Sequence, residues 1–182
     1  MSLPPPLTEE ARGRLLQAYG RIAEFTARVV REQGHELSCG EGCDGCCRGV
    51  LSLRPVEAAY LLEGARALPP EAVSLVWQAL SSGAPGCPVL QGGLCLAYEH
   101  RPALCRTHGL PMIRTEAGET LLHHCPRNFR ETDVSELPPS LVLDEGRLSL
   151  LLDTVDALYR RGAGWDGERV AVDELLRAGL YT

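Results

Sequence analysis

The chain has 182 residues, a length that suits one domain. Its net charge is −6, from 24 acidic and 18 basic residues, so it lacks the basic excess that phosphate binding requires. We therefore expect no nucleic-acid partner. Hydrophobic residues make up 45% of the chain but aromatic residues only 5%, so Leu, Val and Ala must supply most of the core.

The N-terminal residues MSLPPP lack the basic and apolar regions of a secretory signal peptide. No apolar run approaches the ~20 residues that a membrane-spanning helix requires. These features predict a cytoplasmic protein without a membrane partner.

Three helices are predicted in the first half of the chain. Thr8 is placed to cap a helix that runs to about Gln33, with apolar residues recurring at Leu15, Ile22 and Val29. Pro55 suits the first turn of a second helix. The pair Pro69-Pro70 precedes a third helix, which is expected to end near Gly83.

The second half changes character. Residues 88–98 and residues 112–123 are each predicted to form a short β-hairpin, with glycine near the turn. Leucines and Val155 then mark an amphipathic helix over 148–159, and a short helix is expected over 173–178. The sequence predicts a mainly α chain with small β-ribbons, in which amphipathic helices flank a compact Cys-rich metal-binding domain. We divide it into residues 1–135, an N-terminal helix plus the Cys-rich domain, and 136–182, a C-terminal helical extension of the same unit.

Eight cysteines are the most informative feature. Four stand within nine residues, and four more follow in and around the predicted ribbons. Dense thiols in a reducing compartment favour soft-metal ligation over a disulfide framework or inert thiols. The candidate metal ligands are Cys39, Cys43, Cys46, Cys47, Cys87, Cys95, Cys105 and Cys125.

Zinc and iron–sulfur clusters both accept all-cysteine ligation. A zinc ribbon usually has two C-x2-C pairs, whereas this chain has only Cys43 and Cys46 at that spacing. Cys87 and Cys125 each precede a proline, as does the last cysteine of bacterial ferredoxin motifs. The pattern therefore favours a [4Fe-4S] cluster, with zinc as the alternative. Which cysteines share a site, and whether there are one or two centres, stays open.

Other residues match metal or cofactor patterns more weakly. Residues 40–45 fit G-x-G-x-x-G, and Cys43 with Cys46 fits a redox C-x-x-C, but no βαβ unit surrounds either. With eight thiols available, surface or hydrogen-bonding roles are favoured over metal ligation for the nearby histidines. These are His100, His108, His123 and His124.

The order and spacing of these motifs resemble the CxxCxxCC-type zinc- or iron-chelating domain family, over about residues 36–127. The matching residues are Cys39, Cys43, Cys46-Cys47-Arg48, Cys87-Pro88, Leu90, Gly93, Cys95, Tyr98, Arg101-Pro102, Cys105-Arg106 and Cys125. Ala97 departs from the larger aliphatic residue expected there. Similar modules occur in flagellin lysine methylating enzymes, so the resemblance implies metal chelation, with a [4Fe-4S] cluster favoured. It implies no particular activity.

Three classes of function follow. The favoured one is a metal-binding protein that holds a Cys-ligated centre, with Arg101 and Arg106 placed to offset thiolate charge. The second is a cluster-dependent enzyme of methyltransferase-like or radical type, since Cys39, Cys43 and Cys46 have the radical-enzyme spacing, although Cys47 and the missing barrel pattern argue against it. The third is a structural zinc module that mediates protein–protein interaction, with the amphipathic helix over 148–159 docking a partner.

Overall fold

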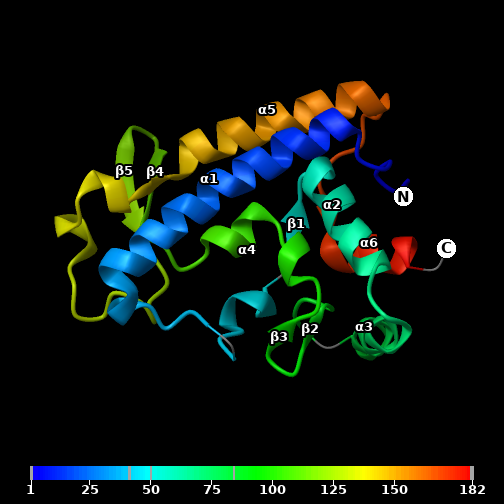
Figure 1. Ribbon diagram of the computed structural model, residues 1–182, viewed down its shortest axis with the longest axis horizontal. Helices are drawn as coiled ribbons and strands as arrows, with labels where there is room; N and C mark the ends of the chain where they lie inside the picture. The colour runs from blue at the N-terminus through cyan, green and yellow to red at the C-terminus, as the bar shows by residue number, and fades with distance from the viewer. Residues whose placement is uncertain (1, 41, 50, 84, 181–182) are drawn as a thin grey trace.

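The computed structural model describes residues 2–40, 42–49, 51–83 and 85–180. The chain is mainly helical, with two- and three-stranded sheets, which confirms the predicted fold class (Figure 1). In the part of the chain described here, no helix is long and apolar enough to cross a membrane.

Two long helices, α1 (Glu9–Gln33) and α5 (Glu145–Ala163), run antiparallel along one side of the molecule (Figure 1). Helix α1 begins where Thr8 caps it, because the Thr8 hydroxyl accepts a hydrogen bond from the amide of Ala11. The apolar face of each helix is buried in a shared core with part of α2. That core contains Ala11, Leu15, Ala18, Tyr19, Ile22, Val56, Ala59, Tyr60, Ala103, Leu152, Val155 and Tyr159.

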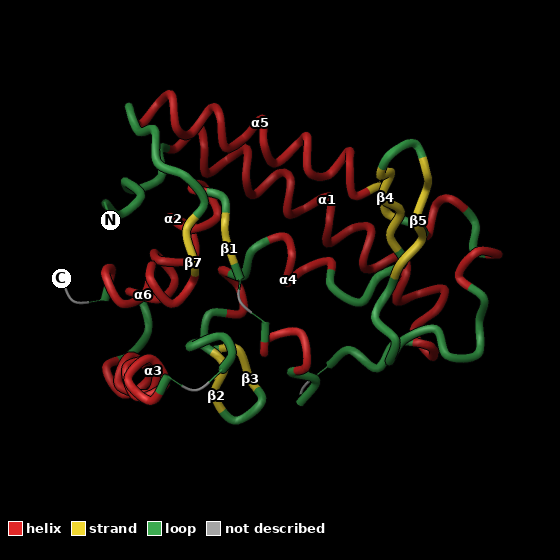
Figure 2. The backbone as a smooth tube through the Cα atoms, turned by 180° about the vertical axis from the view of Figure 1, so that it is seen from behind, coloured by secondary structure: helices red, strands yellow, loops and turns green. Residues whose placement is uncertain are grey.

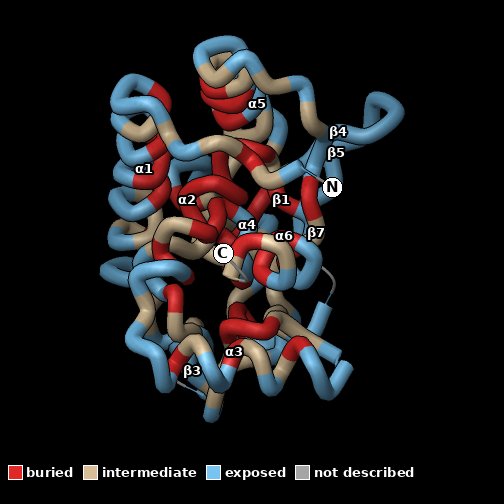
Figure 3. Tube along the Cα trace, turned by 90° about the vertical axis from the view of Figure 1, so that its right-hand side faces the viewer, coloured by how far each residue is buried: buried red, intermediate tan, exposed pale blue. Residues whose placement is uncertain are grey.

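Helix α2 (Pro55–Arg66) lies at the centre of the molecule and is buried on nearly all sides (Figure 3). Helices α3 (Pro70–Ser82) and α6 (Val172–Gly179) join it in a second core. Gly83 ends α3 in the left-handed conformation that favours glycine, with φ +62°. Gly179 allows α6 to pack closely on α2, because a Cβ there would lie 2.3 Å from the side chain of Leu62, which would have to shift.

Both predicted ribbons are present. Strand β2 (Leu90–Gln91) pairs with β3 (Leu94–Cys95), and β4 (Met112–Glu116) pairs with β5 (Glu119–His123), each antiparallel. Two pairings were not predicted: β1 (Ser52–Leu53) with β7 (Val170–Ala171), and a parallel contact of β6 (Leu143–Asp144) with β4. Through β6, β7 and α5, residues 136–182 pack into the sheets and cores of the N-terminal part.

Short elements connect these units. The helix α4 (Ala103–Thr107) and five 3₁₀ turns were not predicted as separate elements. The turns are η1 (Gly34–Glu36), η2 (Gly45–Arg48), η3 (Tyr98–His100), η4 (Val134–Glu136) and η5 (Pro139–Leu141). The segment after α1 crosses below α4 toward the β2–β3 ribbon, so the Cys-rich loop lies beside that ribbon (Figure 2).

Candidate metal centre

The first four cysteines sit on a compact loop. The amide of Cys43 donates to the carbonyl of Gly40 over 3.1 Å, and that of Cys47 donates to Asp44 over 2.9 Å. An ion pair of 2.8 Å joins Arg48 and Asp44 across η2. These local turns hold the four thiols within one tight segment, as the sequence spacing predicts.

Asn128 fastens this loop to the segment after Cys125. Its side chain is only 1% exposed, and its Nδ2 donates to the Sγ of Cys39 over 3.2 Å and to the carbonyl of Gly109 over 2.8 Å. Its Oδ1 accepts from the amide of Ser38 over 2.9 Å. A buried amide thus fixes the position of Cys39 and supplies an N–H donor to its sulfur. Sequence reasoning missed Asn128, because its partners are far away in the chain.

Gly109 makes this contact possible. Its φ is +97°, and a Cβ there would lie 2.7 Å from the Sγ of Cys39 and 3.6 Å from the Cβ of Cys125. Cys39 and Cys125 therefore lie next to the same glycine, although 85 positions separate them in the sequence. Any larger residue would push into the thiol of Cys39. No spacing in the sequence singled out this glycine.

A second contact joins Cys47 to the segment of Cys87. The amide of Cys87 donates to the carbonyl of Cys47 over 2.6 Å. Gly86, at φ +124°, would place a Cβ 3.2 Å from the same carbonyl oxygen. Cys95 is paired with Leu90 in the β2–β3 ribbon that follows. The loop thus contacts the later cysteine segments at both of its ends.

Cys105 is carried by α4, which a buried carboxylate holds in place. Glu57 is 3% exposed, and its Oε1 accepts from the amide of Ala103 over 2.7 Å and from the hydroxyl of Tyr19 over 3.0 Å. Arg54 lies 3.5 Å from the other oxygen of Glu57. This network ties α1, α2 and α4 together beneath the cysteines.

The thiols lie close enough to affect one another electrostatically. Burial raises the pKa of Cys105 to about 12, and the nearby thiols of Cys87, Cys47, Cys95 and Cys46 contribute to the rise. Burial likewise raises the pKa of Cys87 to about 11, with smaller effects from Cys95 and Cys47.

Cys39 belongs to the other end of the same group. Cys39 is exposed as a whole residue, but partial burial of its thiol raises its pKa, as do Cys43, Cys125 and Cys46, while the hydrogen bond from Asn128 lowers it. Burial is also the largest cause of the raised pKa values of Cys46, Cys47 and Cys95. Cys46 contributes to the raised pKa of both Cys39 and Cys105, and Cys47 contributes to that of Cys87 and Cys105. These two thiols therefore connect the two ends of the group.

All eight cysteines are free thiols. Across the four described ranges of the chain, no group of three or more His, Cys, Asp or Glu side chains is arranged so that it could hold a metal ion. The structure therefore brings the predicted ligands into one region without placing them in a coordination geometry.

Three of the four histidines considered as ligands have other contacts. His100 stacks on Tyr60 with ring centroids 4.6 Å apart, and His123 lies 3.0 Å from a carboxylate oxygen of Glu145. His124 packs edge-on against Phe129. These contacts agree with non-ligand roles for the three residues.

The two arginines expected near the thiols differ in their contacts. Arg106 donates to the carbonyls of Arg101 and Glu99 and lies over the ring of Tyr19, so it braces the backbone. Arg101 lies over the ring of Tyr98, and its buried Nε has no hydrogen-bond partner among the described residues. Burial raises the pKa of Cys95, and the charge of Arg101 opposes that rise. Of the two arginines, Arg101 therefore has the charge that favours a thiolate at Cys95.

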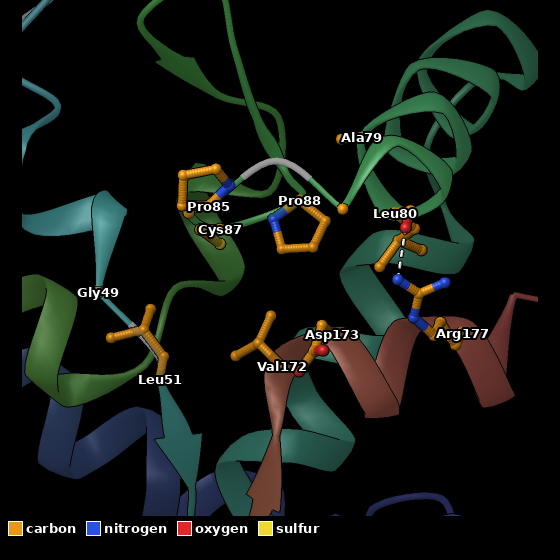
Figure 4. Close-up of a pocket in the computed structure, with 12 residues that line it drawn as sticks. Gly49, Leu51, Ala79, Leu80, Pro85, Cys87, Pro88, Val172, Asp173 and Arg177 are labelled. Carbon is orange, nitrogen blue, oxygen red and sulfur yellow. Dashed lines mark hydrogen bonds between the residues drawn. The ribbon is translucent and has the colours of Figure 1, made fainter.

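A cavity of about 200 Å³ lies beside Cys87, between the end of α3 and the start of α6 (Figure 4). Pro88, Val172 and Asp173 line it, together with Arg177, which donates to the carbonyl of Leu80. Its volume is below the roughly 300–1,000 Å³ of typical small-molecule pockets. The cavity does not favour a site for a nucleoside-sized co-substrate such as S-adenosylmethionine.

Comparisons of this chain with protein-family models, with curated proteins and with solved structures found no match in any of the three. The resemblance to the CxxCxxCC-type chelating domains stays a prediction.

Proposed function

We propose that this protein binds metal through its cysteines and holds a [4Fe-4S] cluster in preference to zinc. One observation carries the proposal: the loop with Cys39, Cys43, Cys46 and Cys47 lies against the segments that carry the other four thiols. These thiols come from distant parts of the chain, remain unbridged, and influence one another's pKa values.

The surroundings of the thiols support a negatively charged sulfur group. Asn128 donates to Cys39, the Nη1 of Arg127 lies 3.8 Å from the Sγ of Cys43, and Arg101 acts on Cys95. N–H donors and cations near ligating sulfurs are known to tune metal–thiolate sites.

The described side chains do not form a ligand set, so binding must bring the thiols closer together. We propose that the metal draws in the 39–48 loop, in which the single turn η2 is the one regular element among the described residues. Metal binding and the ordering of ligand loops are coupled in small Cys-rich domains. The bound group would supply the positive charge that balances several thiolates.

A panel of anaerobically purified variants tests the proposal. Cys43→Ser and Cys105→Ser, one from each end of the thiol group, should each lower the metal content per chain. His124→Ala is the matched control and should keep the wild-type content, because His124 packs on Phe129. Full metal occupancy in both serine variants would contradict the ligand assignment.

A further inference from the structure

A groove runs between α1 and α5 on the outside of the molecule, with a volume of about 690 Å³. We call it the α1–α5 groove. Its principal lining residues are Arg14, Ala18 and Arg21 from α1, and Leu151, Leu158 and Arg161 from α5. All of its lining residues belong to α1 and α5, and none is a cysteine, so it is separate from the thiol group.

The floor of the α1–α5 groove is apolar. Ala18 and Val155 are buried at its base, and the side chains of Leu151 and Leu158 are half-buried above them. Leu150 is 69% exposed, more than any other large hydrophobic residue of the described chain, and lies one turn before the groove residue Thr154. The apolar surface therefore extends to the edge of the groove.

Positive charge borders this floor. Arg14, Arg21 and Arg161 make no side-chain hydrogen bond or ion pair with any described residue. The lining has two acidic residues, Glu10 and Asp153, and Asp153 shares Arg54, at 2.7 Å, with the buried Glu57. Three unpaired arginines stand against two carboxylates in the lining, so the groove carries one excess positive charge on a chain of net charge −6.

The geometry sets the size of an occupant. At 1.5 Å per residue, the stretch of α1 from Glu10 to Arg21 extends about 16 Å, and Arg14 and Arg21 are about two turns apart. A partner helix of about three turns, with a row of apolar residues and carboxylates on its flanks, would match this length and charge. We infer that the α1–α5 groove binds an acidic amphipathic helix of another protein, in the helix-in-groove mode.

Two other occupants fit less well. In a second copy of this chain, the short helix α6 has acidic residues in its first turn, but its Leu175 and Leu176 are buried in its own core. An acyl chain lying in a groove between two surface helices would keep one side in water, which costs the hydrophobic stabilisation of that side. A helix can present polar residues to that side instead.

A binding experiment with the full-length chain tests the inference. The probe is a labelled synthetic helix of about 14 residues with leucines at i, i+3, i+4 and i+7 and glutamates beside them. Its control has lysine at each glutamate position. We expect fluorescence anisotropy to show binding of the acidic peptide only, weakening with added salt. Equal binding of both peptides, or of neither, would overturn the inference.

Charge-reversal variants locate the binding site. Arg21→Glu with Arg161→Glu should weaken the acidic peptide at least about tenfold, because two attractive pairs become repulsive. Arg31→Glu with Arg130→Glu makes the same charge change on exposed residues outside the groove and should alter affinity less than about threefold. Circular dichroism checks that all variants are folded. Equal loss in both double variants would overturn the assignment to the groove.

Leu150→Ser tests the apolar edge and should also weaken the peptide. Two further results would assign the groove to a different occupant and overturn the proposal. One is that the protein floats with phosphatidylserine vesicles, that the Arg21→Glu, Arg161→Glu variant does not, and that the acidic peptide fails to displace the protein from the vesicles. The other is a dimer in analytical ultracentrifugation that dissociates in the groove variant.

Discussion

The side-chain amide of Asn128 donates from its Nδ2 to the Sγ of Cys39 across 3.2 Å. The same buried side chain also binds the backbone of Ser38 and Gly109. A single residue thus joins the start of the Cys-rich loop to the segments on either side of Cys125.

Replacing Asn128 should destabilise this junction. Asn128→Ala leaves the amide of Ser38 and the carbonyl of Gly109 without partners, so we expect a loss of about 2–4 kcal/mol in the free energy of unfolding. Urea unfolding of the metal-free protein measures it. Arg127→Ala, at the exposed neighbouring position, should cost less than about 1 kcal/mol. Equal losses in the two variants would show that Asn128 does not hold the loop.

Gly109→Ala and Gly118→Ala form a matched pair. Both glycines have positive φ, +97° and +87°, so alanine costs about 1–2 kcal/mol at each from backbone strain. Only at Gly109 would the new Cβ also press on Cys39 and Asn128, whereas Gly118 has nothing within 4 Å. Gly109→Ala should therefore lose about 1–3 kcal/mol more and bind less metal. Equal unfolding free energies would contradict the close approach of Gly109 to Cys39.

The buried thiols predict how stability depends on pH. The folded pKa values of Cys87 and Cys105 are about 11 and about 12, above the ordinary value of 9.0. Above pH 9 the unfolded chain releases these protons while the folded chain keeps them, so the metal-free protein should become less stable as pH rises toward 11–12. The slope is up to about 1.4 kcal/mol per pH unit for each thiol. Urea unfolding at several pH values measures this slope.

Cys105→Ser is the control for this effect, because serine does not ionise in the same range. Its unfolding free energy should fall less steeply with pH than that of the wild type. A wild-type curve that is flat above pH 9 would contradict the burial of the two thiols. Since metal ligation requires thiolates, metal binding at neutral pH should also release protons, which isothermal titration calorimetry in two buffers measures.

Glu57 should be the most sensitive charged residue beneath the site. Glu57→Ala leaves the amide of Ala103 and the hydroxyl of Tyr19 without their acceptor and should cost about 3–5 kcal/mol. Glu63→Ala breaks only the half-exposed pair with Arg12 and should cost less than about 1 kcal/mol. Hydrogen exchange at Ala103 should speed up only in the Glu57 variant. Unchanged exchange there would show that Glu57 does not anchor α4.

The helices could be predicted because their signals are local. Thr8 caps α1, Pro55 occupies the first turn of α2, and Gly83 ends α3, each through the backbone of its own few residues. The pairing of β1 with β7 could not be predicted, because two-residue strands carry too short a pattern and their partners are distant in the sequence.

The candidate site was predictable as a set of cysteines but not as an arrangement. Spacing alone identified the eight thiols, and their convergence depends on tertiary contacts such as that of Cys87 with Cys47. Asn128 and Gly109 carry no motif, because one acts through long-range hydrogen bonds and the other through the absence of a Cβ. Arg106 shows the opposite case, since its position beside Cys105 suggested charge compensation but its side chain binds backbone carbonyls.

Metal removal should affect the Cys-rich region more than the long helices. Structural metal binding is worth roughly 10–16 kcal/mol in small zinc domains, and the short ribbons have little core of their own. After chelation, hydrogen exchange should accelerate over the 39–48 loop and the β2–β3 ribbon, while α1, α2 and α5 remain protected by their shared core. Uniform acceleration along the whole chain would contradict this division.

The most direct test of the account is the metal content of the full-length protein, purified without oxygen from cells supplied with iron and zinc. We predict a brown protein with iron and acid-labile sulfide in equal amounts and a charge-transfer absorption that bleaches on reduction. A colourless protein with stoichiometric zinc would show that the cysteines bind zinc rather than a cluster. A protein that contains neither metal would contradict the claim that the eight cysteines hold a metal centre.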